Sequence, residues 1–321
     1  MSEPAPAPMT DSASDASKEP LPITRADYYA TAALLGMFVV TIVLAVAFAK
    51  PFVDAELQAF DDPDDATNSI GYIGLLLVFT FAILWIAKKG KKWMIQVIIL
   101  GAVGSTMVYL VPPFAGMIGI PATASWLLGI AVGIACAVGL WKYPEWWVID
   151  SVGVLVAAGA ASLFGISLNV LPVIVLLVGL AIYDAIAVYR TKHMLALADT
   201  VMDLRLPILL VIPKQRGYSF LKEVAQFKKA DESEGESERD ALFMGLGDLV
   251  MPTILVVSAV TFDWPAWAAW GAALGTLWGY LMLMATVLQG KPQAGLPLLN
   301  GGAILGFLLG LYAATGSIVF W

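Results

Sequence analysis

Cysteine, histidine and charged residues are scarce in this chain of 321 residues, and each scarcity excludes a class of protein. The single cysteine, Cys136, lies inside an apolar run, so it forms no intrachain disulfide, and we interpret it as a packing residue. The single histidine, His193, lies in the hydrophilic sequence RTKHM. There is no HExxH zinc motif, and a serine–histidine dyad within the apolar runs lacks its base. We therefore expect no metal site and no cofactor.

Apolar residues take the place of the missing charges. Hydrophobic residues make up 60% of the chain and charged residues 13%, and the mean hydropathy is +0.82. Soluble domains are closer to half apolar and a quarter charged, so this composition indicates a multi-span protein of the lipid bilayer. The net charge of −7 argues against a nucleic-acid partner. The fold class that follows is an all-α polytopic membrane protein.

Nine apolar runs are long enough to be membrane-spanning helices, since one span needs roughly 20 mostly apolar residues. The runs are 28–49, 70–87, 93–112, 121–141, 147–167, 169–189, 241–260, 266–288 and 295–319. The first 26 residues are rich in Pro, Ala, Ser and acids, a composition typical of disorder. The expected organisation is a disordered cytoplasmic tail (1–26), transmembrane helices 1–6 (27–189), a cytoplasmic hydrophilic loop (190–240) and transmembrane helices 7–9 (241–321).

Basic residues in the connections predict the orientation. With nine spans, 17 of the 18 Lys and Arg residues fall on the side of the amino terminus, and Lys50 alone falls on the other. Cytoplasmic connections of membrane proteins carry the excess of Lys and Arg. We therefore expect a cytoplasmic amino terminus and an external carboxyl terminus.

Acidic residues inside apolar spans are costly and are candidates for function. Asp27 and Asp150 fall at span ends, where we interpret them as interfacial carboxylates. Asp184 lies six residues before Arg190 at the end of the sixth span, about 9 Å from the cytoplasmic surface if the span is helical. Asp248 lies eight residues into the seventh span, about 12 Å deep. The two acids are thus expected at nearly one depth on consecutive helices.

Glycines flank the second of these acids in the sequence Gly245-Leu246-Gly247-Asp248. Small residues let helices approach closely in lipid, so we expect the two glycines to bring the acids together. Two carboxyl groups close together in a medium of low dielectric constant share a proton. Such a pair can hold a water, activate it as a nucleophile and protonate the carbonyl that it attacks. This is aspartyl-protease chemistry.

These motifs resemble those of a known family. Tyr183-Asp184 in one span and Gly245-Leu246-Gly247-Asp248 in the next are similar to the YD and GxGD motifs of the presenilin and signal peptide peptidase intramembrane proteases. Nine spans and a long hydrophilic loop between the sixth and seventh also fit a presenilin-like fold. The family's third motif, Pro-Ala-Leu, corresponds here to Pro297-Leu298-Leu299, in which leucine replaces alanine. The resemblance implies that these three residues position the substrate.

The resemblance further implies the substrate and the partners. Substrates would be transmembrane helices of type I orientation, because the expected orientation is that of presenilin, and a prokaryotic, archaeal-type homologue would act alone or as a homo-oligomer. A helical substrate must unwind before water can attack it, and an unwound strand in lipid needs new hydrogen-bond partners. We expect LRLPILLVIP at 204–213, or the stretch before the seventh span, to pair with it as an added strand. The alternative for 204–213 is a loop lying on the membrane surface.

Two other functions stay open on the residues alone. Paired intramembrane carboxylates also serve proton- or cation-coupled transporters and leak channels. No convincing internal repeat relates the halves of the chain, and the acids lie in the cytoplasmic third rather than at the midplane, which disfavours transport. A non-catalytic scaffold would leave the two buried acids unexplained.

Overall fold

A computed structural model describes residues 24–60, 62–90, 92–191, 209–215, 217–220, 241–289 and 293–319. His193 and the residues 204–208 of the expected strand lie outside these ranges. The helices are α1 (Arg25–Asp54), α2 (Ala66–Lys88), α3 (Lys92–Met117), α4 (Ala122–Lys142), α5 (Trp146–Ser167), α6 (Val170–Ile186), α9 (Leu246–Thr261), α10 (Ala266–Val287) and α11 (Gly295–Thr315). A π-helical turn, η1 (Ala187–Thr191), continues α6, and two strands are β1 (Leu209–Pro213) and β2 (Ala241–Gly245).

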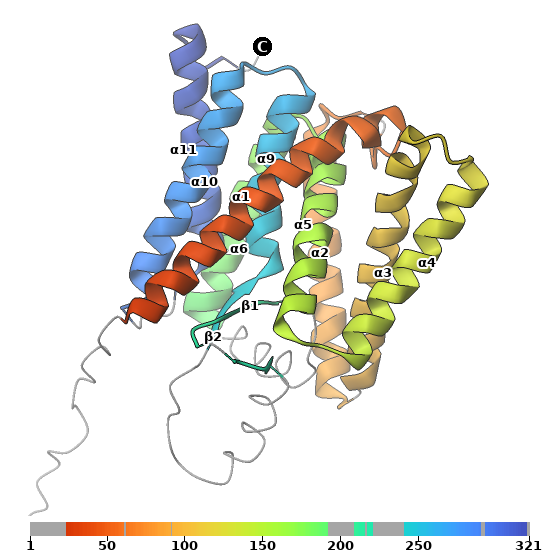
Figure 1. The fold of residues 1–321 in the computed structure, drawn as a ribbon. Helices are drawn as coiled ribbons and strands as arrows, with labels where there is room; N and C mark the ends of the chain where they lie inside the picture. The colour runs from red at the N-terminus through yellow and green to blue at the C-terminus, as the bar shows by residue number, and fades with distance from the viewer. Residues whose placement is uncertain are drawn as a thin grey trace, which may run out of the picture.

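The helices run roughly side by side, with the two strands at the end where α1 begins (Figure 1). α5 and α9 pack against α1, and α6 packs against α2, α9 and α11. The largest buried cluster joins residues of α1, α5, α6, α9, α10 and α11, while α3 and α4 form a pair at the edge of the bundle. Many large apolar side chains on the outer faces are exposed, among them Trp267, Trp270 and Trp278 of α10. This arrangement fits a bundle surrounded by lipid.

Eight of the helices in the described ranges are long and apolar enough to cross a membrane. The ninth, α9, has 16 residues. At 1.5 Å per residue it is about 24 Å long, short of the roughly 30 Å of a hydrocarbon core. The expectation of one helix over 241–260 was therefore wrong for its first five residues, which form β2. A short apolar run does not by itself distinguish a strand from a helix. Residues 241–245 form a strand because they pair with β1.

Glycines set the distance between α10 and α11. A methyl group added to Gly271, Gly275 or Gly279 of α10 would collide with backbone atoms of α11, and one added to Gly306 would collide with α10. Backbones this close require residues without a Cβ, which is how helices pack in lipid. The same device joins α3 to α4 through Gly133, whose added Cβ would lie 2.6 Å from the carbonyl oxygen of Gly104.

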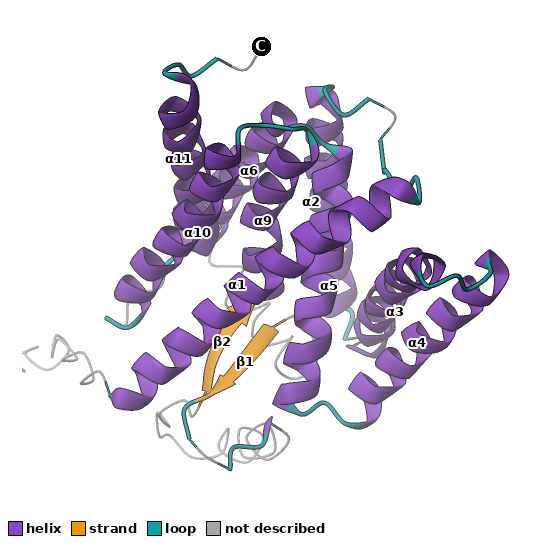
Figure 2. Cartoon of the chain, turned by 45° about the horizontal axis from the view of Figure 1, so that its top comes forward, coloured by secondary structure: helices purple, strands orange, loops and turns teal. Residues whose placement is uncertain are grey.

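β1 and β2 form an antiparallel two-stranded sheet, shown in orange in Figure 2. Leu209 lies opposite Gly245, and Pro213 lies opposite Ala241. The strand character expected for the apolar stretch is confirmed over 209–213. Its partner strand is the beginning of the expected seventh span rather than the stretch before it. Because β2 ends at Gly245 and α9 begins at the next residue, the sheet leads directly into the segment that carries Asp248.

Candidate active site

The spacing of GLGD has a local structural reason. Gly245 is the N-cap of α9, with φ −67° and ψ 138°, and it carries no capping side chain. Asp248 is the third helical residue, and its carboxylate accepts a hydrogen bond from the backbone of Gly245. An acid at this position that reaches back to the N-cap N–H is one half of a capping box. The motif therefore holds the Asp248 side chain over the start of α9, where the helix dipole favours a negative group.

Asp184 lies in the last turn of α6 and is 4% exposed. Directly after this turn the helix widens into the π-helical turn η1. Its carboxylate oxygen Oδ2 accepts a hydrogen bond from the backbone N–H of Leu296 at 3.0 Å, and the backbone of Gly295 donates to the same carboxylate. These donors are the first two residues of α11, whose N–H groups have no partner within the helix. The amino terminus of α11 thus binds the Asp184 carboxylate, as helix starts bind anions.

Gly295 also contacts the second acid. A Cβ added to Gly295 would lie 3.2 Å from Oδ1 and 3.3 Å from Oδ2 of Asp248. Asp184 in turn lies within electrostatic range of Asp248. The structure therefore brings Asp184 and Asp248, which we call the central pair, together at the start of α11. Sequence reasoning missed Gly295 and Leu296 as members of this site.

Two details of the expected site differ in the structure. The three residues Pro297, Leu298 and Leu299 come just after the segment that contacts the acids. Pro297 lines a groove of about 270 Å³ between α6 and α11, and Leu299 is buried in the core. The expectation that the glycines of GLGD bring two helices together was wrong for Gly247, because an added Cβ there would meet nothing within 4 Å. Asp184 reaches the start of α11 through hydrogen bonds, and Asp248 reaches it through its close approach to Gly295.

The neighbours of the acids in the motifs have separate positions. Leu246 packs against α5, since its Cδ2 atom would lie 3.0 Å from a Cβ added to Gly153. Tyr183 is half-buried on α6, and its hydroxyl forms no hydrogen bond to any residue in the described ranges. Gly247 is exposed and leaves open space beside Asp248.

The two acids assigned to the interface are buried instead. Asp27 is 8% exposed and Asp150 is 4% exposed, so protein covers both of these span-end carboxylates. Asp27 forms an ion pair with Lys214 at 2.7 Å, just after β1. Asp150 accepts the backbone N–H of Val211, in the middle of β1, at 2.8 Å. We call Asp27 and Asp150 the flanking pair, because each holds the strand β1 rather than the other acid.

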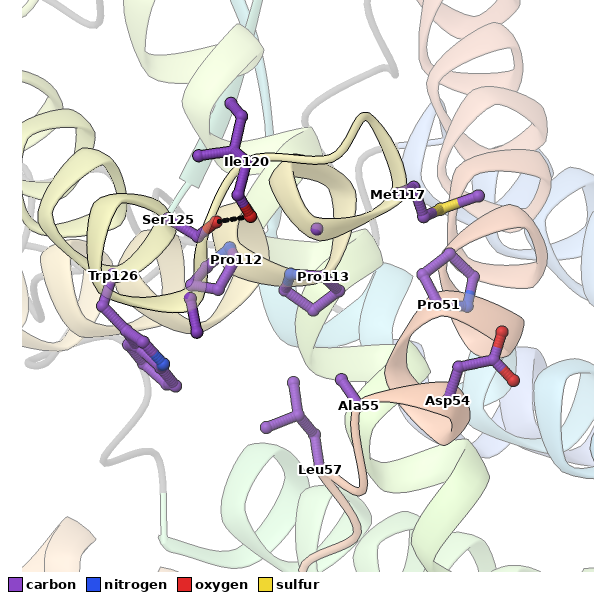
Figure 3. A pocket seen from close by; sticks show the side chains of 12 residues that line it. Pro51, Asp54, Ala55, Leu57, Pro112, Pro113, Met117, Ile120, Ser125 and Trp126 are labelled. Carbon is purple, nitrogen blue, oxygen red and sulfur yellow. Dashed lines mark hydrogen bonds between the residues drawn. The ribbon is translucent and has the colours of Figure 1, made fainter.

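A second concave region lies at the opposite end of the bundle (Figure 3). This pocket of about 460 Å³ is lined by the end of α1 and by the turn from α3 to α4, including Pro113 and Trp126. Ser125 donates a hydrogen bond to the carbonyl of Ile120 at its wall, at 3.2 Å. Asp54 is the one ionisable residue among the described residues that line it. The pocket therefore lacks the paired acids of the site at the other end.

Comparison with known proteins decides the family. Residues 35–316 match the family model described as "Signal-peptide peptidase, presenilin aspartyl protease". The chain belongs to this family. The chain is 37% identical to the protein in the "Structure of a presenilin family intramembrane aspartate protease in C222 space group", over 88% of this chain and 99% of that one, with a TM-score of 0.64. The chain is 38% identical to the protein in the "Structure of a presenilin family intramembrane aspartate protease in P2 space group". That match covers 88% of this chain and 97% of the other, with a TM-score of 0.63.

No curated protein matches the chain. Membership of the presenilin and signal peptide peptidase family nevertheless confirms the resemblance inferred from YD and GLGD, together with the all-α multi-pass membrane fold.

Proposed function

We propose that Asp184 and Asp248 are the catalytic residues with which this chain cleaves its substrates. Membership of the family makes the chain an intramembrane aspartyl protease, whose substrates are transmembrane segments within the bilayer. The single observation that carries the assignment is that both carboxyl groups meet at Gly295, the first residue of α11. Two acids, one water and no metal suffice for this reaction.

The proposed chemistry begins with a water held between the two carboxyl groups. One carboxylate takes a proton from the water as its oxygen attacks the carbonyl carbon of the substrate, and the other, protonated acid gives its proton to the carbonyl oxygen. The resulting gem-diol collapses: one hydroxyl returns its proton to the second carboxylate as the carbonyl re-forms, the carbon–nitrogen bond breaks, and the leaving nitrogen receives the proton that the first carboxylate had accepted. The backbone N–H groups of α11 hold Asp184 in place throughout. The open space beside Gly247 leaves room next to Asp248 for the substrate backbone.

An unwound substrate can add to the outer edge of β2. Val211 donates its N–H to Asp150, so Val211 and Phe243 form a non-hydrogen-bonded pair of the ladder. The N–H and C=O of Phe243 therefore face away from β1. These outward groups offer main-chain hydrogen bonds to an extended segment. β2 leads into α9 only three residues before Asp248, so a strand added there runs toward the acids. Replacing Val211 by proline should change the sites of cleavage, and replacing Leu210, whose N–H faces β2, should abolish cleavage.

Orientation and partners complete the proposal. α1 begins at the end of the bundle that carries the strands, and α11 ends at the opposite end (Figure 1). With the excess of Lys and Arg in the cytoplasm, the strand end and the central pair are cytoplasmic and the carboxyl terminus is external. Substrates of type I orientation then present their amino-terminal side outside. The chain works alone or as a homo-oligomer.

The test compares purified wild-type protein with Asp184→Asn and Asp248→Asn on a single-span type I substrate in detergent. Asp263→Asn serves as a matched control, because Asp263 lies in a turn with φ 54°, which asparagine also tolerates. We expect cleavage within the span by the wild type and the control, and none by the other two variants. Persistent cleavage by both Asp184→Asn and Asp248→Asn would refute the assignment.

The rival transport function is tested with the same proteins in liposomes. A proton or cation flux that is lost in Asp184→Asn and Asp248→Asn, with no cleavage of any substrate by the wild type, would favour a transporter or channel. Cleavage without flux supports the protease.

A further inference from the structure

The strand β1 has two edges, and the structure gives them different surroundings. One edge pairs with β2. On the other, the N–H of Val211 points away from β2 and is bound at 2.8 Å by Oδ1 of Asp150, in the first turns of α5. Leu210 next to it presses its Cδ2 atom toward Gly153, where an added Cβ would lie 3.3 Å away. Asp150 and Gly153 are three residues apart and share one face of α5, so this face supports β1 directly.

A buried aspartate such as Asp150 lowers the stability of a membrane helix, so stability alone does not explain it. It is 4% exposed, and its second carboxylate oxygen, Oδ2, has no hydrogen-bond partner among the described residues. A buried polar atom without a partner destabilises a fold, and an apolar side chain in its place is often neutral or stabilising. Val211, whose N–H it accepts, belongs to a buried apolar cluster with Ile149, Val152 and Phe220. A reason other than packing is needed for a carboxylate here.

We propose that Asp150 is a positioning residue that caps the outer edge of β1, so that a substrate strand adds at the edge of β2 and in one register. This inference rests on the proposed protease function. An unoccupied strand edge is a template for another chain, and proteins block such edges with inward-pointing charged side chains or by covering them. Asp150 does both, since it takes the N–H of Val211 and brings α5 over the edge. The one edge left to the substrate is then the one that leads to Asp248.

A second contact fixes the strand along its own axis. Lys214, the residue after β1, forms its ion pair with Asp27 at 2.7 Å in the first turn of α1. Asp27 is itself held by Thr24, whose N–H and hydroxyl both donate to Oδ2 of Asp27 at 2.8 Å. Sliding β1 by one residue would turn every side chain to the opposite face, and sliding it by two would break both contacts. Asp150 and Asp27 therefore define the register that the paired strand β2 presents to a substrate.

The first experiment measures where the substrate is cut. Full-length wild type, Asp150→Ala and Asp150→Asn are incubated with one single-span substrate, and the products are identified by mass spectrometry. In Asp150→Ala we expect the share of cleavage at the principal bond to fall at least threefold, with new cuts displaced by two or more residues. Asp150→Asn keeps an oxygen that accepts the N–H of Val211, so it should retain the wild-type pattern. Ser162→Ala, which removes another unpaired buried polar group farther along α5, is the matched control.

The second experiment removes the donor instead of the acceptor. Val211→Pro deletes the N–H bound by Asp150 but keeps the ladder to β2, because proline is tolerated where the N–H faces away from the sheet. It should give the scattered cuts of Asp150→Ala, and the double variant Asp150→Ala/Val211→Pro should be no worse than either, since both remove one interaction. Leu210→Pro removes an N–H that faces β2 and should abolish cleavage altogether.

The outcomes separate this inference from the proposed function. If Asp150→Ala folds, as judged by size exclusion and melting temperature, and keeps the wild-type cut sites and KM, the capping role is refuted. Equal scattering in Asp150→Ala and Asp150→Asn would refute it too, as would additive effects in the double variant. If Asp184→Asn and Asp248→Asn still cleave the substrate, the proposed function fails instead, whatever Asp150 does. Should Asp150→Ala fail to fold, Val211→Pro decides by the same cut-site measurement.

Discussion

The two pairs of aspartates at the strand end of the bundle differ in what their carboxylates bind. The central pair, Asp184 and Asp248, converges on the start of α11, and each carboxylate also binds a backbone N–H at a helix start. The flanking pair binds β1: Asp27 binds the side chain of Lys214, just after the strand, and Asp150 binds an N–H within it. In sequence all four are single acids in or beside apolar helices.

The difference shows that an acid in a membrane helix is not a sign of catalysis by itself. What distinguishes the central pair is a second carboxyl group within electrostatic range. A lone carboxylate can hold a backbone segment, whereas two that face one site can share a proton and a water. In the proposed function the flanking pair contributes through the strand that it holds, next to the edge of β2 to which the substrate would add.

Asparagine at each of the four positions tests this comparison most strongly. Asparagine keeps an acceptor oxygen but cannot exchange a proton as a carboxyl group does. We expect Asp184→Asn and Asp248→Asn to lower the rate of cleavage by about 10³-fold or more, and Asp150→Asn by less than about tenfold. Initial rates on one substrate, with melting temperatures as a check on folding, measure the contrast. If Asp150→Asn lowered the rate of cleavage as much as Asp248→Asn, the proposed difference between the two pairs would be wrong.

Gly295→Ala is expected to have the next largest effect. Its new Cβ would lie 3.2–3.4 Å from the carboxyl atoms of Asp248, so the acid or the start of α11 must shift by a few tenths of an ångström. Misplacement of a reacting group lowers the rate steeply, and we expect about 10- to 100-fold slower cleavage with little change in melting temperature. Gly301→Ala, on the same helix, would place its Cβ in open space and should change neither quantity. An unaltered rate for Gly295→Ala would argue against the contact.

Lys214→Met is expected to have the smallest effect of the three. It breaks the partly buried ion pair with Asp27, in which the side chains are 24% and 11% exposed, and should lower kcat/KM two- to fivefold, or about 0.4–1 kcal/mol. Lys50→Met breaks an exposed ion pair with Asp54 on the same helix α1 and should leave cleavage unchanged. Equal effects of the two changes would show that the ion pair between Asp27 and Lys214 does not contribute to cleavage.

Much of the site could be predicted from the sequence because its chemistry is carried by rare residues. In a chain with 13% charged residues, Asp184 and Asp248 are conspicuous, and the YD and GLGD motifs indicated the family that the comparisons then confirmed. Gly295 and Leu296 could not be found in this way. They act through backbone N–H groups and through the absence of a Cβ, so their side chains carry no chemical signal. They stand directly before the expected Pro297-Leu298-Leu299, and their role depends on where α11 begins.

The sequence by itself determined the apolar helices, the long hydrophilic connection and the two acids of the central pair, because hydropathy and charge are properties of single residues and short runs. The tertiary structure alone decided that 241–245 is a strand, that Asp27 and Asp150 are buried around β1, and that α11 presents its first N–H groups to Asp184. Each of these depends on a partner that is distant in the chain. A strand and a bound carboxylate each need a partner, and the residues around them in the sequence do not reveal which distant group it is.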